Sequence, residues 1–394
     1  MNSDNLIPLC EPLFRGREKE YLANCIDSGW VSSAGQYVRQ LEEGFEKILP
    51  GCRAAAVSSG TAAMFLALRG LRVPPDSEVI VQDVTFAGTV NPVIHLGARP
   101  LFMDIDESTL SLDPEKLDDF FRNRIIRRNG INYNRESGRA VAAVIAAHLY
   151  GLPARIEEIA GICSRYGVPL IEDAAESLGA TWEDRPTGTF GQVAIFSLNG
   201  NKLVTGGSGG IVVASDARLI QEVKRWSDHY RSEEDRWVYE RAGYNYQLNN
   251  LQAAVALAQL EQLPQKIARK RQVHDLYAEL FQQVPEVSLL EEVFPGRASY
   301  WINVIQIENS DVTDVIAELA SGGIEARPVF KPLHTMKPYQ DYLMLEPLSG
   351  TEYSSSCCCL PSSENLTTSQ QEQVVERVIA AVRYGTKQRR GEHV

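Results

Sequence analysis

The sequence predicts an α/β protein with a large domain on a mostly parallel sheet and a smaller C-terminal α/β domain. Its 394 residues exceed what one ordinary hydrophobic core holds. Short apolar runs alternate with helical patterns from about residue 53 to residue 215, which is typical of repeated strand–helix–strand units. Because this alternation changes after two long helical patterns, we divide the chain into residues 1–262 and 263–394.

The alternating segment gives the order of elements in the large domain. Strands are expected at Ala54–Val57, Glu78–Val81, Arg99–Met103, Ala140–Ala146 and Val168–Ile171, and helices at Gly60–Arg69, Gly88–His95 and Arg155–Tyr166. The polar, Asn-rich segment 123–137 is expected to be a surface insertion. In open α/β sheets, ligands bind at the carboxyl ends of the strands, so candidate site residues are expected there.

The second half of the chain favours helices around a smaller sheet. Helical patterns cover Leu251–Leu263 and Lys266–Gln283, followed by an expected strand at Tyr300–Ile307 and helices at Val312–Leu319 and Ser369–Tyr384. Three consecutive cysteines, Cys357–Cys359, are interpreted as small buried side chains on a further strand.

Composition excludes several classes of function. The formal net charge is 39 − 51 = −12, which disfavours non-specific binding to nucleic acid or to anionic membranes. The longest apolar run, Val141–Ala147, is too short to span a bilayer, and the first residues lack a signal-peptide pattern. Seven cysteines without zinc spacing or a disulfide framework predict reduced thiols in a cytoplasmic protein and no metal site.

Small residues in Ser58–Ala63 follow an expected strand and open an expected helix. Such a helix start brings backbone N–H groups close to an anion, so Gly60 and Thr61 are candidate phosphate ligands. An ordinary helix N-cap would explain the same residues.

Two ionisable residues complete a candidate site. Asp173 ends a hydrophobic strand, where it could face a ligand or could cap the next helix. Lys202 lies between small polar residues and the glycine-dense stretch 206–210. A desolvated lysine can supply a neutral amine that forms a Schiff base with an aldehyde.

Together these residues match the requirements of pyridoxal 5'-phosphate (PLP). This cofactor needs an amine for its aldehyde, a carboxylate for its pyridine nitrogen, donors for its phosphate and a flat surface for its ring. Lys202, Asp173, Gly60 and Thr61 with Ser197, and Phe86 could supply these groups in that order. Phe86 taken alone would be interpreted as a core aromatic.

The ordered set of motifs resembles the DegT family of PLP-dependent sugar aminotransferases. The resemblance runs from Gly29–Ser33 through Tyr244–Tyr246 to Arg327–Pro328 and Pro332–His334, nearly the whole chain. It implies PLP fold type I, as in aspartate aminotransferase, with a seven-stranded, mostly parallel sheet in the PLP-binding domain. It also implies a homodimer with shared active sites.

Within that family, the sequence is most similar to the branch that aminates UDP-linked 4-keto-6-deoxy-N-acetylhexosamines, of the bacillosamine and legionaminic acid type. Segments Cys25–Ser33, Glu172–Gly179 and Asn199–Lys202 carry this similarity. It implies transfer of an amino group from glutamate to C4 of the sugar, with Lys202 as the catalytic proton shuttle. The alternative acceptor is GDP-4-keto-6-deoxymannose, as in perosamine synthesis.

The resemblance also implies roles for single residues. Ser197 would donate to the phosphate of its own subunit's cofactor, and Asn245 to that of the partner subunit. Glu176 would lie near the phenolic oxygen of the cofactor ring, where many members carry Gln. Trp30 and His334 would lie near the sugar nucleotide. Gln247, where Arg is common, departs from the family pattern and bears on the substrate.

Two other functions fit the same fold. Related sugar dehydratases carry His where this chain has Lys202, so the sequence disfavours dehydration. A regulatory protein that kept the fold would not need the complete set of cofactor residues, which favours an enzyme.

Overall fold

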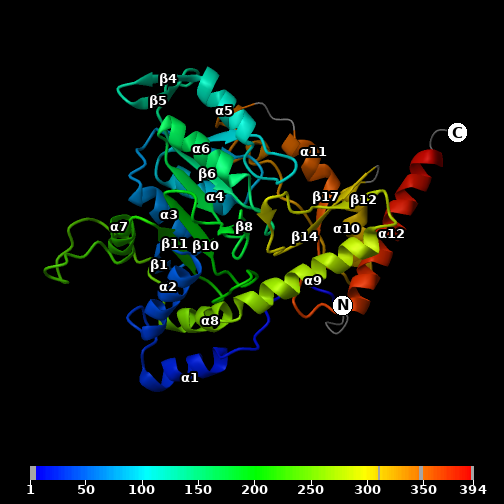
Figure 1. The fold of residues 1–394 in the computed structure, drawn as a ribbon, viewed down its shortest axis with the longest axis horizontal. Coiled ribbons are helices and arrows are strands. Elements are labelled where there is room, and N and C mark those ends of the chain that lie inside the picture. The colour runs from blue at the N-terminus through cyan, green and yellow to red at the C-terminus, as the bar shows by residue number, and fades with distance from the viewer. Residues whose placement is uncertain (1–5, 309–310, 346–348, 392–394) are drawn as a thin grey trace.

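A computed structural model describes residues 6–308, 311–345 and 349–391. The first part of the chain folds into a layered α/β unit (Figure 1). Its helices are α1 (Glu18–Ser28), α2 (Gln36–Ile48), α3 (Gly60–Gly70), α4 (Ala87–His95), α5 (Pro114–Asn123), α6 (Ile156–Tyr166), α7 (Ala217–Ser227) and α8 (Asn250–Leu260). Its main strands are β1 (Arg53–Val57), β2 (Glu78–Gln82), β3 (Arg99–Met103), β6 (Val141–Ala147), β7 (Leu170–Asp173), β10 (Val193–Ser197) and β11 (Gly210–Ala214).

The central sheet has the order β1-β11-β10-β7-β6-β2-β3-β16. All neighbouring strands are parallel except β11, which is antiparallel to both β1 and β10. The sheet has one strand more than the expected seven, because β16 (Met344–Leu345) returns from the C-terminal part and pairs with β3. The expected fold class, an α/β protein with a mostly parallel sheet, is confirmed.

Alternating side chains of the sheet bury against helices on both faces, as the period of a strand requires. One face packs against α3, α4 and α7, and the other packs against α2 and α8 at one end and α5 and α6 at the other. Because consecutive residues face opposite layers, Asp173 at the end of β7 lies on the same side as Ile171, toward α3 and α4.

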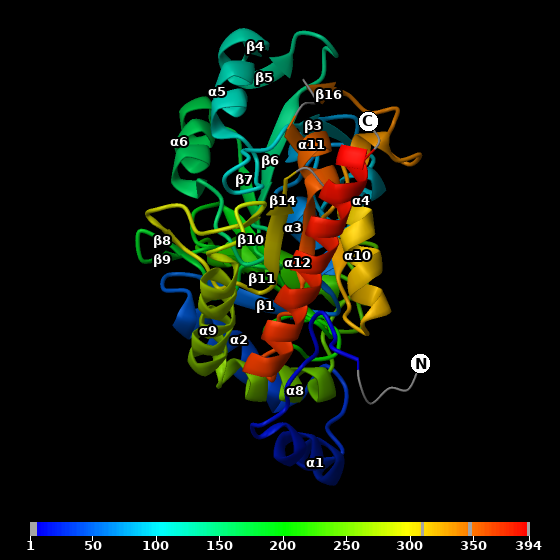
Figure 2. The same cartoon turned by 90° about the vertical axis from the view of Figure 1, so that its right-hand side faces the viewer.

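The C-terminal part builds a second sheet around its own core. Helix α9 (Leu263–Phe281) runs from α8 to this part, where α10 (Val312–Ser321) and α12 (Thr368–Gly391) pack on the sheet (Figures 1 and 2). The strands, all antiparallel, are β12 (Val287–Leu289), β14 (Asn303–Ile307), β17 (Cys357–Leu360) and β15 (Arg327–Pro328). The three consecutive cysteines lie buried on β17, as expected. The domain division at residues 262 and 263 stays a prediction.

The remaining elements are short. They are β4 (Ile125–Arg128), β5 (Ile131–Asn134), β8 (Thr181–Trp182), β9 (Arg185–Pro186), β13 (Gly296–Arg297), the 3-10 helix η2 (Leu333–Thr335) and α11 (Ser349–Ser356). Strands β4 and β5 form a hairpin within the segment expected to be a surface insertion. Among the described helices, none combines the length and apolar composition that a membrane crossing requires.

Candidate active site

The start of α3 forms a cradle of backbone donors at the carboxyl end of β1. Ser59 caps the helix, and its Oγ accepts a hydrogen bond of 3.1 Å from the backbone N–H of Ala62. The first N–H groups of a helix have no partner within the helix, and the helix dipole favours an anion there. A Cβ placed on Gly60 would lie 3.0 Å from the Cβ and 3.1 Å from the Oγ of Ser197, so a larger residue would crowd this hydroxyl.

Asp173 places a carboxylate at the end of β7, beneath α4. It is 6% exposed, and its Oδ2 accepts a 2.7 Å hydrogen bond from Thr89 Oγ1. Its Oδ1 accepts a 3.1 Å bond from the backbone N–H of Ala175. Burial raises the pKa of Asp173, and the Thr89 hydrogen bond opposes that rise. A buried carboxylate held by neutral donors is suited to a cationic ligand.

Lys202 lies at the centre of the site and is paired with Glu176. Its Nζ lies 2.9 Å from Glu176 Oε1, and the other oxygen of that carboxylate accepts a 3.0 Å hydrogen bond from the Tyr150 N–H. The backbone around Lys202 turns tightly, with the Lys202 N–H donating to the Asn199 carbonyl at 3.0 Å. Because both oxygens of Glu176 are held, the amine is kept at one position in the cavity.

The glycine-dense stretch after Lys202 has a steric cause. Gly209 has φ +135°, a conformation that other residues rarely adopt. Gly210 opens β11 against the backbone of Ser59, and a Cβ on Gly210 would clash with the carbonyl oxygen of Ser59. These glycines therefore bring the Lys202 loop and the α3 cradle together.

Phe86 presents a flat apolar surface in the same place. It is the residue before α4 and is 59% exposed, which is unusual for a phenylalanine beside a core. A Cβ on Gly88 would lie 2.9 Å from the Phe86 ring. A glycine in the first turn of α4 therefore lets this ring lie where it does. Its ring could stack on a planar ligand.

One cavity of about 390 Å³ collects most of the predicted site residues. Those that line it are Gly60, Thr61, Phe86, Asp173, Glu176, Ser197 and Lys202. They come from the carboxyl ends of β1, β7 and β10, from the starts of α3 and α4, and from the loop after β10. The parallel strands thus place at one sheet edge residues that are up to 142 positions apart, from 60 to 202.

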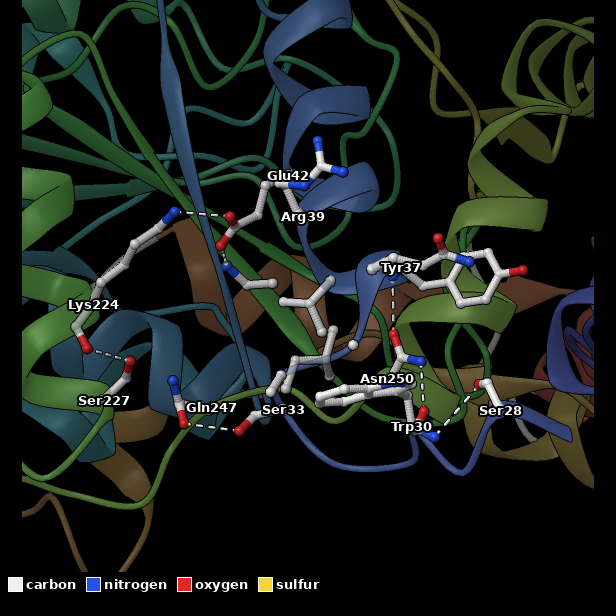
Figure 3. A pocket seen from close by; sticks show the side chains of 16 residues that line it. Ser28, Trp30, Ser33, Tyr37, Arg39, Glu42, Lys224, Ser227, Gln247 and Asn250 are labelled. Atoms are coloured by element: carbon white, nitrogen blue, oxygen red, sulfur yellow. Dashed lines mark hydrogen bonds and ion pairs between the residues drawn. The ribbon is translucent and has the colours of Figure 1, made fainter. Parts of the chain in front are cut away.

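Three predicted residues lie outside this cavity. Trp30 is 57% exposed and lines an open pocket of about 650 Å³, where its carbonyl accepts a 2.7 Å hydrogen bond from Asn250 Nδ2 (Figure 3). Asn245 is exposed on the segment that follows α7. His334, on η2, is held by Asp83, which accepts bonds of 2.5 Å from its Nδ1 and 2.9 Å from its backbone N–H.

The structure also adds residues that the motifs did not indicate. Thr89 hydrogen-bonds Asp173, the Tyr150 backbone N–H donates to Glu176, and the ring centroid of Trp301 lies 3.7 Å from Lys202 Nζ. Each lies at least 26 positions from the residue it contacts, so no local pattern indicates it.

The residues present fit PLP. Asp173 is a buried carboxylate whose hydrogen-bond donors in the described chain are neutral, which suits a protonated pyridine nitrogen. The start of α3 with Ser197 suits a phosphate, Phe86 suits an aromatic ring, and Lys202 supplies the amine for the aldehyde.

Two curated relatives match most of the chain. EpsN of Bacillus subtilis (strain 168), named as a candidate pyridoxal phosphate-dependent aminotransferase, is 36% identical over 330 residues, covering 84% of this chain and 82% of EpsN. GDP-perosamine synthase of Vibrio cholerae is 33% identical over 338 residues, covering 85% of this chain and 88% of that enzyme.

Solved structures agree with the fold. A DegT/DnrJ/EryC1/StrS aminotransferase from Brucella abortus superposes with a TM-score of 0.84 at 26% identity, over 92% of this chain and 95% of that one. DesI, solved with its TDP-sugar product, superposes with a TM-score of 0.87 at 24% identity, over 99% of this chain and 96% of its own. These neighbours share PLP fold type I.

The profile of one aminotransferase family extends across nearly all of the sequence. It matches residues 13–379, which include all seven predicted site residues that line the cavity. The chain is therefore an enzyme and belongs to the DegT/DnrJ/EryC1/StrS aminotransferase family.

Proposed function

We propose that this enzyme is a PLP-dependent transaminase that moves an amino group from glutamate to C4 of a nucleotide-linked 4-keto-6-deoxy sugar. Aminotransferases of this family depend on PLP. The observation that carries the proposal is the single cavity that holds a buried acid, Asp173, a paired amine, Lys202, and a helix start with a neighbouring hydroxyl.

Each cofactor group has a residue assigned to it. Lys202 would hold the aldehyde carbon, Asp173 the pyridine nitrogen, Phe86 the ring face, and Gly60, Thr61 and Ser197 the phosphate. When bound, PLP supplies an electron sink for the bond that is broken at the α-carbon of the amino donor.

Lys202 is proposed to move the proton of the reaction. Its Nζ, when it is not bonded to the cofactor, would act as the base that takes a proton from the donor's α-carbon and as the acid that returns it. Glu176 Oε1, 2.9 Å from that nitrogen, keeps the amine at its position between these transfers. The low exposure of Asp173 and Glu176 excludes water from this end of the cavity.

The named relatives favour a GDP-linked acceptor. Three of them, at 32–33% identity, are GDP-perosamine synthases, which supports GDP-4-keto-6-deoxymannose over the UDP-linked N-acetylhexosamine that the motifs predicted. We therefore place the GDP-linked sugar first and keep the UDP-linked sugar as the second candidate.

The second subunit is part of the proposal. Asn245 is exposed outside the cavity of its own chain, which suits a contact with a partner's cofactor in a homodimer.

A direct comparison of acceptors tests the assignment. Purified enzyme with PLP and glutamate is incubated separately with the GDP-linked and the UDP-linked 4-keto-6-deoxy sugar, and sugar-nucleotide mass is measured. We expect the keto oxygen to be replaced by an amine, faster with the GDP-linked sugar. Faster turnover of the UDP-linked sugar would make that sugar the first candidate acceptor. A product that has lost a hydroxyl group and gained no amine would indicate a dehydratase.

A further inference from the structure

A tryptophan from the C-terminal half of the chain contacts the Lys202 segment in two ways. Trp301 Nε1 donates a 2.7 Å hydrogen bond to the carbonyl oxygen of Asn201, the residue before Lys202. Lys202 Nζ lies over the face of the same indole, 3.7 Å from the ring centroid. One side chain therefore contacts both the backbone and the amine of the residue that is proposed to carry the cofactor.

Trp301 is itself firmly held. It is 5% exposed, and its carbonyl oxygen accepts a 2.9 Å hydrogen bond from the buried ammonium of Lys270 on α9. The segment that carries it, 298–302, packs against Gly151: the Ser299 N–H donates to the Gly151 carbonyl at 2.9 Å. A Cβ on Gly151 would clash with the backbone nitrogen of Trp301, so this glycine permits the close approach.

Glu176 forms an ion pair with the Lys202 amine, and the indole of Trp301 adds an uncharged contact to the same amine. An ammonium over an indole face is attracted to the ring, and the attraction grows when water is excluded. A hydrogen bond to the Asn201 carbonyl fixes the peptide from which the lysine side chain starts. Cys10 Sγ donates to the same carbonyl at 3.4 Å, so this oxygen has two donors.

We propose that Trp301 is a positioning residue for Lys202, which sets where the amine lies in the cavity and shields it from small solutes. Its carrier segment lies between β13 and β14, outside the central sheet that supplies Asp173 and Ser197. The C-terminal part of the chain would thus help to determine cofactor capture.

The test uses full-length protein freed of PLP and two substitutions of different severity. Trp301→Phe keeps a ring face but removes the indole N–H, whereas Trp301→Leu removes both. Trp182→Phe is the matched control, since Trp182 is also 5% exposed but does not line the cavity. Circular dichroism and thermal melting establish that each variant is folded.

Two readouts separate positioning from general stability. Reductive methylation with formaldehyde and cyanoborohydride, followed by peptide mass measurement, gives the rate at which Lys202 reacts, with exposed Lys337 as internal reference. Titration with PLP gives the dissociation constant. We expect Trp301→Leu to speed methylation of Lys202 while weakening PLP binding about tenfold, and Trp301→Phe to weaken it about threefold.

A faster methylation of Lys202 together with weaker PLP binding would indicate that Trp301 positions the amine. The inference would be overturned if the methylation rate and the PLP dissociation constant were unchanged in the two Trp301 variants. It would also be overturned if both changed equally in Trp182→Phe. The PLP readout rests on the proposed function, but the methylation readout does not. Wild-type protein that fails to capture PLP would therefore contradict the proposed function alone, while methylation would still decide the role of Trp301.

Discussion

The cavity around Lys202 and the open pocket around Trp30 differ in how deeply their charged groups are buried. In the cavity, Asp173 and Glu176 are buried, and each accepts hydrogen bonds from fixed groups. In the open pocket the indole of Trp30 is exposed, and neutral hydrogen bonds dominate, such as the 3.0 Å bond from Ser33 Oγ to Gln247 Oε1 (Figure 3). An ion pair between Lys224 and Glu42, at 2.7 Å, lies at its edge.

Single side chains matter more in the cavity than in the open pocket. A charge removed from water costs free energy unless a partner or ligand offsets that cost. Groups in an open pocket compete with water, so each one contributes less. Substitutions in the cavity should therefore have large effects on chemistry and cofactor binding, and those in the open pocket small effects on substrate binding.

The largest effect is expected for Lys202→Ala. Without the amine no group at that position moves the proton, so the turnover number should fall at least about a thousandfold. Stopped assays of amino-sugar formation measure this rate. A variant that retains more than about a tenth of wild-type turnover would show that another group moves the proton.

The next effect is expected for Asp173→Asn. This substitution keeps the shape and the hydrogen bond from Thr89 but removes the charge, so PLP binding should weaken about a hundredfold. Equilibrium titration measures the dissociation constant. Affinity within a factor of about three of wild type would remove Asp173 from its proposed role.

Asp173→Asn should also stabilise the PLP-free protein at neutral pH. Because burial raises the pKa of Asp173, its protonated form favours folding, and this contribution is lost as pH rises through the raised pKa. The asparagine variant lacks this loss, so its melting temperature should exceed that of wild type at neutral pH. The difference should shrink as pH falls below the raised pKa, and it should be smallest below about pH 4, where the carboxyl becomes protonated in the unfolded chain as well.

A smaller effect is expected for Ser197→Ala. The loss of one hydroxyl donor should weaken PLP binding about tenfold. Pyridoxal, which lacks the phosphate, serves as the control ligand, and its affinity should stay unchanged. Equal loss for both ligands would place Ser197 away from the phosphate.

The smallest effect is expected in the open pocket, for Trp30→Ala. The KM for the sugar nucleotide should rise about threefold with kcat and PLP affinity unchanged, because an exposed ring offers limited burial to a substrate. Ile26→Ala is the matched control, since Ile26 is exposed on α1 but does not line the pocket. A large fall in kcat for Trp30→Ala would remove the distinction between the two regions.

Local motifs predicted the part of the site that lies near strand ends. Ser197 and Lys202 are close in sequence, and Gly60 and Asp173 follow apolar runs, so the parallel sheet brings them together. Thr89 and Trp301 could not be predicted, because their roles arise from packing between segments that are 84 and about 100 positions from their partners.

The fold shows the same division. The repeated strand–helix pattern indicated the central sheet, whereas the two-residue strand β16 carries too little pattern to be seen. Helix α2 was missed although Tyr37, Leu41 and Phe45 lie four residues apart and are buried, which is a signal of a helical face. The polar insertion concealed the β4–β5 hairpin, because its two strands have only four residues each and lie in a polar segment.

Amino transfer through Lys202 is tested most directly by the first half of the reaction, carried out without any sugar. PLP-loaded enzyme is mixed with glutamate, and the cofactor's absorbance is followed while 2-oxoglutarate is measured. We predict that wild-type enzyme converts its cofactor to the amine form with an equal amount of 2-oxoglutarate, and that Lys202→Ala does not. An unchanged wild-type cofactor, or equal conversion by the variant, would contradict amino transfer through Lys202.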